Sequence, residues 1–112
     1  MDDDDLLNLE ALPISEGEDA LGRAFRVTAR GEIDIATVAR LHDLLTGLID
    51  RGAHLVVLDT EGVQFLDSSG LRVLILAGNR LADAGGRLLI EGMSGAVQRV
   101  LEITGLIDQY RR

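Results

Sequence analysis

The chain switches repeatedly between two hydrophobic periods, and this alternation restricts the folds that it can adopt. Two short, continuous apolar runs, residues 55–58 and 88–90, are typical of strands buried on both faces, as in a sheet covered by helices. The neighbouring segments repeat apolar residues at helical spacing and end at Gly52, Gly85 and Gly105. Helices that alternate with such strands predict a mostly parallel sheet.

We therefore expect a single α/β domain with a mixed, mostly parallel sheet of about four strands flanked by helices. Its predicted order is strand, strand, helix, strand, helix, strand, helix. Residues 15–22 are predicted as a turn and residues 60–66 as a loop. The predicted strands are 6–14, 25–30, 55–58 and 88–90, and the predicted helices start at Ile35, Leu71 and Ser94.

The net charge of the chain belongs to its N-terminal segment. Residues 1–19 carry eight acids and no base, whereas residues 20–112 carry eleven acids and eleven arginines. We predict an acidic, mobile arm over residues 1–8, with a role as an interaction arm left open, and one domain over 9–112. The body is neutral and only three residues are aromatic. We therefore expect no nucleic-acid partner.

The residue inventory also excludes several kinds of chemistry. Without Cys there are no disulfides or thiolate sites, and without Lys there is no Walker-type phosphate loop. His42 and His54 lie at no spacing typical of a metal site or a catalytic base, so we expect no metal, no cofactor and no enzymatic activity. No apolar run approaches the ~20 residues of a membrane span, and the acidic N-terminus is unlike a secretory signal. The sequence predicts a cytoplasmic protein without a membrane partner.

The segment most informative about function follows the apolar run 55–58. The sequence DSSG at residues 67–70 leads into an apolar helix and so puts two hydroxyl groups at a helix N-terminus. Either serine can cap an orphan backbone N–H, which stabilises a helix by about 1 kcal/mol. One cap needs only one acceptor, and Asp67 can supply it instead. From the residues alone, capping and a functional role both remain open.

Residues 55–71, LVVLDTEGVQFLDSSGL, closely resemble the signature of the STAS domain, the fold shared by anti-sigma factor antagonists and the cytoplasmic tails of sulfate transporters. Residues 31–34, GEID, are similar to the family's glycine-glutamate-leucine-aspartate turn. Residues 96–101 and 104–106 resemble its late helix and the turn after it. The resemblance covers roughly residues 22–108 and is strongest to the free-standing bacterial antagonists. It implies a STAS fold and a role in sigma factor regulation.

The resemblance also implies a phosphorylation site. In the family, an anti-sigma factor serine kinase of the GHKL type phosphorylates the serine after the aspartate of the DSSG turn, which is Ser68 here; Ser69 is less favoured. The unmodified antagonist binds the anti-sigma factor and frees sigma. Phosphorylation switches the antagonist off, and a PP2C-type phosphatase resets it. By the same resemblance, Asp34 lies beside the site and helps to dock the kinase, and Asp67 flanks the acceptor.

The turn is physically suited to a switch. A helix N-terminus tolerates an anion, so phosphorylation there need not unfold the domain. The phosphate adds about −1.5 to −2 charges, and a partner carboxylate about 5 Å away would repel each unit by roughly 3 kcal/mol at a dielectric near 20. Such repulsion weakens binding about a hundredfold or more. The residues predicted to bind a partner are Asp34, Asp67, Ser68, Ser69, Gly70 and Arg72.

Two features depart from the family pattern. Arg72 stands where the family commonly has a small residue, so it pairs with Asp67, contacts a partner or is simply exposed. The chain also ends at Arg112, where many relatives add a strand and a helix. Such an open edge favours a homodimer or leaves Leu106 and Ile107 partly exposed.

Two alternatives to the switch remain at this point. One is a STAS-type binding module for a small ligand, a lipid-transport complex or a membrane transporter, without phosphorylation. The other is a structural scaffold in which Ser68 only caps a helix.

Overall fold

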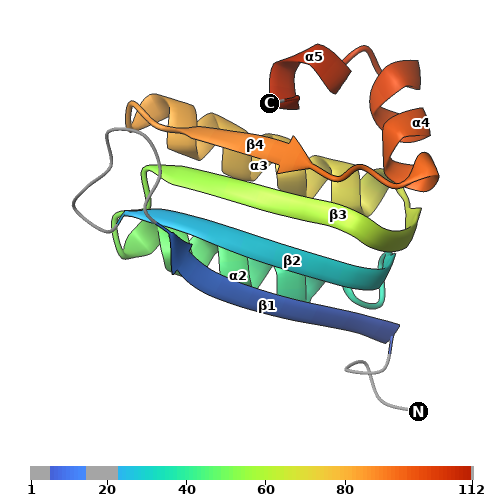
Figure 1. Ribbon diagram of the computed structural model, residues 1–112, viewed down its shortest axis with the longest axis horizontal. Helices are drawn as coiled ribbons and strands as arrows, with labels where there is room; N and C mark the ends of the chain where they lie inside the picture. Colours follow the sequence, from blue (N-terminus) through green and yellow to red (C-terminus); the bar gives the residue numbers. More distant parts are fainter. Residues whose placement is uncertain (1–5, 15–22, 112) are drawn as a thin grey trace.

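Four strands form one mixed sheet in the computed structural model, which describes residues 6–14 and 23–111. The strand order is β1-β2-β3-β4 (Figure 1). β1 runs antiparallel to β2, whereas β2, β3 and β4 are mutually parallel. The predicted α/β architecture is therefore confirmed. The elements in chain order are β1 (Leu7–Ile14), β2 (Ala24–Ile33), α2 (Val38–Asp50), β3 (Leu55–Leu66), α3 (Ser68–Asp83), β4 (Arg87–Glu91), α4 (Gly95–Ile103) and α5 (Ile107–Tyr110).

The hydrophobic core lies between the sheet and the helices α2 and α3, which lie behind the sheet in Figure 1. Val56 and Val57 point to opposite faces of β3 and are both fully buried, as predicted for residues 55–58. α4 packs against β3, and α5 contacts α4 and β4. The large core side chains that are almost completely buried are Leu7, Val27, Ile33, Leu41, Leu45, Val56, Leu58, Leu74, Leu81, Ile90, Leu101 and Tyr110.

β1 begins inside the segment expected to be an acidic arm. Leu7 is fully buried in the core, and the Arg40 guanidinium donates a hydrogen bond to its carbonyl oxygen. The end of the segment 1–8 is thus part of the sheet. Residues 1–5 lie outside the described residues, and so does the turn predicted at 15–22.

β3 is longer than predicted, because residues 60–66 continue the strand instead of forming a loop. They pair in parallel with the end of β2, and the register shifts twice along this stretch. The buried residues Thr60, Val63 and Leu66 are therefore three apart instead of two. A search for strict alternation misses such a strand. As a result, a strand leads directly into the DSSG turn.

The helix starts differ from the predictions by up to three residues. α3 begins at Ser68, so the DSSG turn forms the first helical turn. α2 begins at Val38, after a turn over residues 34–37. α4 begins as predicted, with Ser94 as its N-cap; the Ser94 Oγ accepts a hydrogen bond from the backbone N–H of Val97 at 3.2 Å.

The sequence did not predict α5, the single helical turn near the end of the described chain. Its Tyr110 is buried, and its ring lies so close to α3 that a Cβ added at Gly78 would be 3.0 Å from Tyr110 Cε1. Leu106 and Ile107 pack against the core but stay partly exposed. Partial exposure of these two residues was one of the two expectations stated for the C-terminal segment, the other being a homodimer. Arg111 then forms an isolated parallel bridge with β4.

Candidate functional site

The carboxyl ends of β2 and β3 bring the two predicted site segments together. Ile33 and Leu66 are partners at the ends of these parallel strands. The backbone N–H of Asp67 donates to the Ile33 carbonyl oxygen at 3.2 Å, which ties the DSSG turn to the turn that begins at Asp34. Parallel sheets commonly bind ligands and partners at this edge.

Asp34 organises the turn between β2 and α2. Its Oδ1 accepts hydrogen bonds from the backbone N–H groups of Ala36 at 2.9 Å and Thr37 at 3.1 Å. The buried Thr37 hydroxyl donates to the carbonyl oxygen of Glu32 at 2.7 Å. Asp34 thus fixes the local backbone and leaves the side chain of Ile35 80% exposed beside the DSSG turn.

Asp67 caps α3, and neither serine does. Its Oδ1 accepts hydrogen bonds from the backbone N–H groups of Ser69 at 2.9 Å and Gly70 at 3.2 Å, and from the Ser69 hydroxyl. The Ser69 hydroxyl is the largest cause of a lowered pKa at Asp67; partial burial opposes it, and the N–H groups of Gly70, Ser69 and Ile35 reinforce it. Asp67 is therefore a carboxylate at neutral pH.

The two serines of the turn have different environments. Ser69 is partly buried, and its hydroxyl donates to Asp67. Ser68 is exposed, and its hydroxyl has no hydrogen bond to any residue that the structure describes. Of the two hydroxyls, the one at Ser68 is therefore the one open to reaction with another molecule.

Gly70 allows α3 to approach the strand ends closely. A Cβ at this position would lie 2.5 Å from Leu66 Cδ1 and 2.6 Å from Ile33 Cγ2. These separations are shorter than real Cβ contacts, so any larger residue would push the helix away. Gly70 is itself buried, and a direct contact with a partner stays a prediction.

Exposed apolar side chains lie on the segments that precede and follow Ser68 in the chain. Phe65, near the end of β3, is 47% exposed, and so is Leu76 on α3. Ser68, Arg72 and Leu76 are spaced four residues apart and so form one stripe along α3. We call Ile35, Phe65, Ser68, Arg72 and Leu76 the acceptor face.

Arg72 is exposed, as one of its predicted environments required. It forms no ion pair with Asp67 or with any other acid in the described part of the chain. Pairing with Asp67, the first of its three predicted environments, is therefore not observed. The charge of Arg72 is presented to the solvent at the acceptor face.

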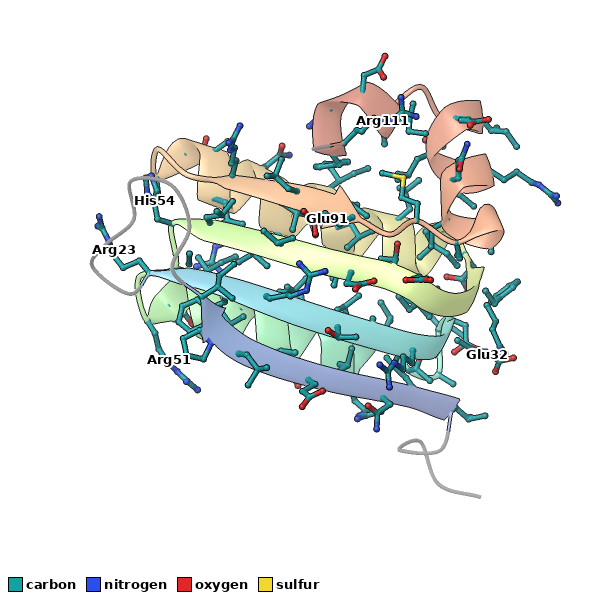
Figure 2. All side chains as sticks on the ribbon, viewed as in Figure 1. Arg23, Glu32, Arg51, His54, Glu91 and Arg111 are labelled. Carbon is teal, nitrogen blue, oxygen red and sulfur yellow. The ribbon has the colours of Figure 1, made fainter. Side chains whose placement is uncertain are left out.

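The histidines lie away from the site. His54 precedes β3 at the end opposite to the DSSG turn, as Figure 2 shows. His42 is on the exposed side of α2, and its Nδ1 lies 3.3 Å from Asp43 Oδ1. Among residues 6–14 and 23–111, no cluster of three or more acids or histidines is arranged to hold a metal, and no helix is long and apolar enough to cross a membrane.

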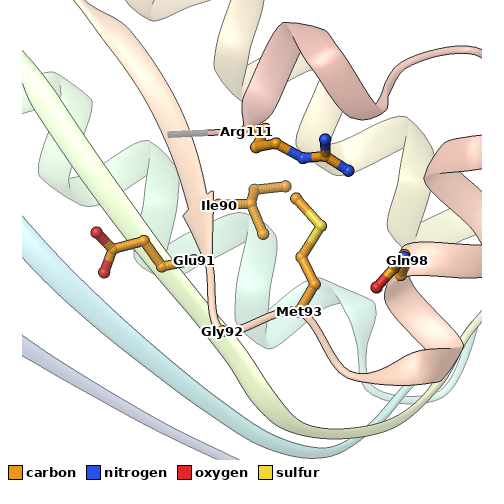
Figure 3. A pocket seen from close by; sticks show the side chains of 6 residues that line it. All are labelled: Ile90, Glu91, Gly92, Met93, Gln98 and Arg111. Atoms are coloured by element: carbon orange, nitrogen blue, oxygen red, sulfur yellow. The ribbon is translucent and has the colours of Figure 1, made fainter.

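A separate depression of about 490 Å³ lies beside β4 and α4 (Figure 3). Its Glu91 points away from the opening (Figure 3) and forms an ion pair with Arg26 at 2.8 Å; Arg26 also pairs with Asp59 at 3.1 Å. No residue of the acceptor face lines it. The lining residues are Ile90, Glu91, Gly92, Met93, Gln98 and Arg111.

Residues 19–110 match the family model of the STAS domain, which covers both turns of the site. The chain belongs to the STAS domain family. An anti-sigma-B factor antagonist of Staphylococcus aureus is 33% identical over 84 residues, covering 75% of this chain and 78% of that protein.

Solved STAS structures share the fold of this chain. The anti-sigma factor antagonist SpoIIAA in its unphosphorylated form superposes with a TM-score of 0.77 at 20% identity, covering 93% of this chain and 85% of that one. The phosphorylated form of SpoIIAA, a Bacillus cell fate determinant, superposes with a TM-score of 0.73 at 19% identity. This match covers 93% of this chain and 88% of that one. This STAS domain is thus similar in sequence to anti-sigma factor antagonists and in fold to SpoIIAA.

Proposed function

We propose that this STAS domain is an anti-sigma factor antagonist that binds an anti-sigma factor kinase and is switched off by phosphorylation of Ser68. The observation that carries the proposal is the exposed Ser68 hydroxyl, which forms no hydrogen bond in the part of the chain that the structure describes, since Asp67 caps the helix. The sequence similarity to anti-sigma-B factor antagonists supports the same role.

ATP is the phosphoryl donor in the proposed transfer. The Ser68 oxygen attacks the γ-phosphorus, the new O–P bond forms, and the bond from phosphorus to the β–γ bridging oxygen breaks so that ADP leaves. The hydroxyl proton passes to a base, which the kinase must supply because Asp67 already accepts three hydrogen bonds on one oxygen and is a weak base. The STAS domain is the substrate of this step and not its catalyst.

The unmodified acceptor face suits a protein partner. Ile35 beside the DSSG turn, Phe65 just before this turn in the chain, and Leu76, two helical turns along α3, offer exposed apolar area, and Arg72 adds one positive charge. Apolar side chains with an arginine among them are typical of the centre of a protein interface. We infer that the anti-sigma factor covers this face and thereby releases its sigma factor.

Phosphorylation would reverse this binding through charge. The phosphate adds about −1.5 to −2 charges at a place that already holds the carboxylates of Asp34 and Asp67. The cap of α3 does not depend on the Ser68 hydroxyl, so the fold is retained while the surface changes. A PP2C-type phosphatase would reset the switch by attack of water on phosphorus, returning the serine hydroxyl and inorganic phosphate. Because the donor is ATP, we place the protein in the cytoplasm.

A transfer assay tests the phosphorylation step. The chain is incubated with each anti-sigma factor kinase of its source organism, ATP and Mg²⁺, and the modified residue is located by mass spectrometry. We expect one phosphate on Ser68, full loss of transfer in Ser68→Ala, and retained transfer in the control Ser94→Ala. Transfer that persists in Ser68→Ala, or no transfer from any kinase, would contradict the proposal.

A binding assay tests the electrostatic switch separately. We expect Ser68→Asp to fold normally and to bind the kinase at least several-fold more weakly than the wild type, because it puts a carboxylate at the acceptor position. Ser68→Asn is the matched control, since it has a similar size without the charge. Equal affinities of the Asp and Asn variants would count against repulsion as the mechanism.

A second candidate function, a binding module for a small ligand, is favoured by the depression beside β4. Its volume lies in the range of ligand pockets, and Arg111 and Gln98 offer it a charge and an amide. A nuclear magnetic resonance titration with benzoate tests this function. Shifts confined to Gly92, Met93 and Arg111, and lost in Arg111→Gln, would support it, whereas an unchanged spectrum would oppose it.

A further inference from the structure

We propose that Arg72 binds the phosphate on Ser68 within the same chain, so that phosphorylation also withdraws the arginine from the partner. This inference rests on the proposed function, since it concerns the regulation of the same site. Its basis is the combination of an occupied helix N-terminus, two neighbouring carboxylates and an exposed arginine one helical turn away.

Two of the backbone donors that usually hold an anion at a helix N-terminus are already in use. The N–H groups of Ser69 and Gly70 donate to the Asp67 side chain at 2.9 and 3.2 Å. A phosphate on Ser68 therefore cannot take these two donors without displacing Asp67. This differs from the common arrangement in which free N–H groups receive the anion.

The charges around Ser68 favour a nearby cation once this residue carries a phosphate. Asp67 precedes the phosphorylated residue directly and keeps its negative charge at neutral pH, and Asp34 lies at the neighbouring strand end. A phosphate with about −1.5 to −2 charges would be repelled by both carboxylates. A nearby cation would offset part of this repulsion.

Arg72 is placed to supply that cation. Residues four apart on a helix have their Cβ atoms about 6 Å apart, and Arg72 is four residues after Ser68 on α3. Both side chains are exposed, and Arg72 is held by no acid among the residues described. A guanidinium matches a phosphate with two parallel N–H···O bonds.

Three other arginines are engaged elsewhere. Arg26 forms its ion pairs on the sheet, Arg40 donates to the carbonyl oxygen of Leu7, and Arg80 pairs with Asp50 at 2.9 Å. Arg80 also lies two further helical turns along α3 from Arg72. Of the two arginines on α3, Arg72 is therefore the one that lies a single helical turn from Ser68.

The pairing gives phosphorylation two effects at once. In the unmodified chain, the charge of Arg72 is available to an acidic residue of the partner. In the modified chain, the phosphate occupies Arg72 and also repels that acidic residue. The partner thus loses an attraction and gains a repulsion from one covalent change.

The test measures the ionisation of the phosphate without any kinase. Phosphoserine is introduced at position 68 during translation, and the second ionisation of the phosphate is followed by phosphorus resonance against pH. We expect the pKa of the phosphate in the wild type to be about 0.3 unit lower than in Arg72→Gln, the size of one helical ion pair. Arg72→Lys should retain much of this difference, and the control Arg99→Gln, an exposed arginine on α4, should leave the wild-type value unchanged.

Equal phosphate pKa values in the wild type and Arg72→Gln would overturn the inference, and so would an equal change in Arg99→Gln. Because the phosphate is installed during translation, absence of kinase transfer to Ser68 would contradict only the proposed function. Conversely, a missing pKa difference would leave the transfer assay valid. The Gln variant is compared with the wild type by circular dichroism, and its exposed position predicts an unchanged fold.

Discussion

The N-termini of α3 and α4 have similar positions and use their serines differently. Each helix follows a parallel strand of the sheet, and each N-cap has an extended backbone, with ψ of −174° at Asp67 and 164° at Ser94. In α4 the serine hydroxyl is the cap. In α3 a carboxylate is the cap, and the Ser68 hydroxyl has no hydrogen bond within residues 6–14 and 23–111. A serine at a helix start therefore either caps the helix or keeps its hydroxyl for another molecule. Which of these it does depends on whether the residue before it supplies the cap.

The glycines of the two helix starts differ in the same way. Gly70 is buried against Ile33 and Leu66, whereas a Cβ at Gly95 would meet nothing within 4 Å. The start of α3 therefore combines its carboxylate cap with tight packing at the glycine, whereas the start of α4 has its hydroxyl cap and an open glycine. Tight packing at Gly70 holds the neighbouring Ser68 in one position, which favours its recognition by a partner.

The largest effect on stability should come from breaking the tight packing of α3. We expect Gly70→Ala to reduce the free energy of unfolding by about 1–3 kcal/mol, because the new Cβ overlaps the branched side chain of Ile33. Gly95→Ala is the matched control and should be neutral or stabilising by up to about 1 kcal/mol. Urea denaturation measures both. A loss of stability in Gly95→Ala as large as that in Gly70→Ala would contradict this account of the packing.

Removing the carboxylate cap should have the next largest effect. We expect Asp67→Ala to cost about 1–2 kcal/mol, since two backbone N–H groups and the Ser69 hydroxyl lose their acceptor. Asp67→Asn should restore part of the stability, because an amide oxygen also caps helices. Thermal unfolding of the three proteins gives their order of stability. An Asp67→Ala variant as stable as the wild type would show that a serine can replace the carboxylate cap.

The stabilisation by Asp67 should also depend on pH. Its pKa is lower in the folded chain than in the unfolded chain, so the folded state favours the carboxylate. The contribution is therefore fully present above the unfolded value, about 3.9, and is lost as the pH falls through the folded value. The stability difference between wild type and Asp67→Asn, measured from pH 7 to pH 2, should shrink below about pH 4. A stability difference that grows as the pH falls would contradict the lowered pKa of Asp67 in the folded chain.

The hydroxyl cap of α4 should be worth less than the carboxylate cap of α3. We expect Ser94→Ala to reduce stability by about 1 kcal/mol, because one N–H, that of Val97, loses its acceptor. Ser94→Asp should restore it, since Asp caps helices as well as Ser does. Denaturation midpoints measure both, and a Ser94→Ala midpoint equal to that of the wild type would remove the contrast between the two helix starts.

The smallest effect should come from Ser68 itself. We expect Ser68→Ala to change the free energy of unfolding by no more than about 0.5 kcal/mol, because the exposed hydroxyl has no hydrogen bond among the described residues. The same substitution should abolish phosphoryl transfer. A Ser68→Ala variant that loses as much stability as Ser94→Ala would show that this hydroxyl is also structural.

Most of the sheet was predictable because its strands follow simple periods. The apolar runs 55–58 and 88–90 lie in β3 and β4 as expected. The second half of β3 was missed because the register shifts space its buried residues three apart. α5 was missed because four residues are too few to show a helical period.

The site was predictable in its position but not in its bonding. The motifs at residues 31–34 and 67–70 meet at one sheet edge, as the strand order required. The choice of Asp67 over the serines as cap depends on backbone geometry, which residue types do not reveal. Sequence also gave no sign that Ile35 and Phe65 are exposed, since apolar residues at strand ends are usually assigned to the core.

The contact between Tyr110 and Gly78 makes the end of the chain observable without a label. Tyr110 is the single tyrosine of the sequence, and there is no tryptophan, so intrinsic fluorescence comes from this one ring. Burial raises the pKa of its phenol above 10. The emission of Tyr110 and its ultraviolet titration therefore report whether α5 is seated on α3, the helix that carries Ser68.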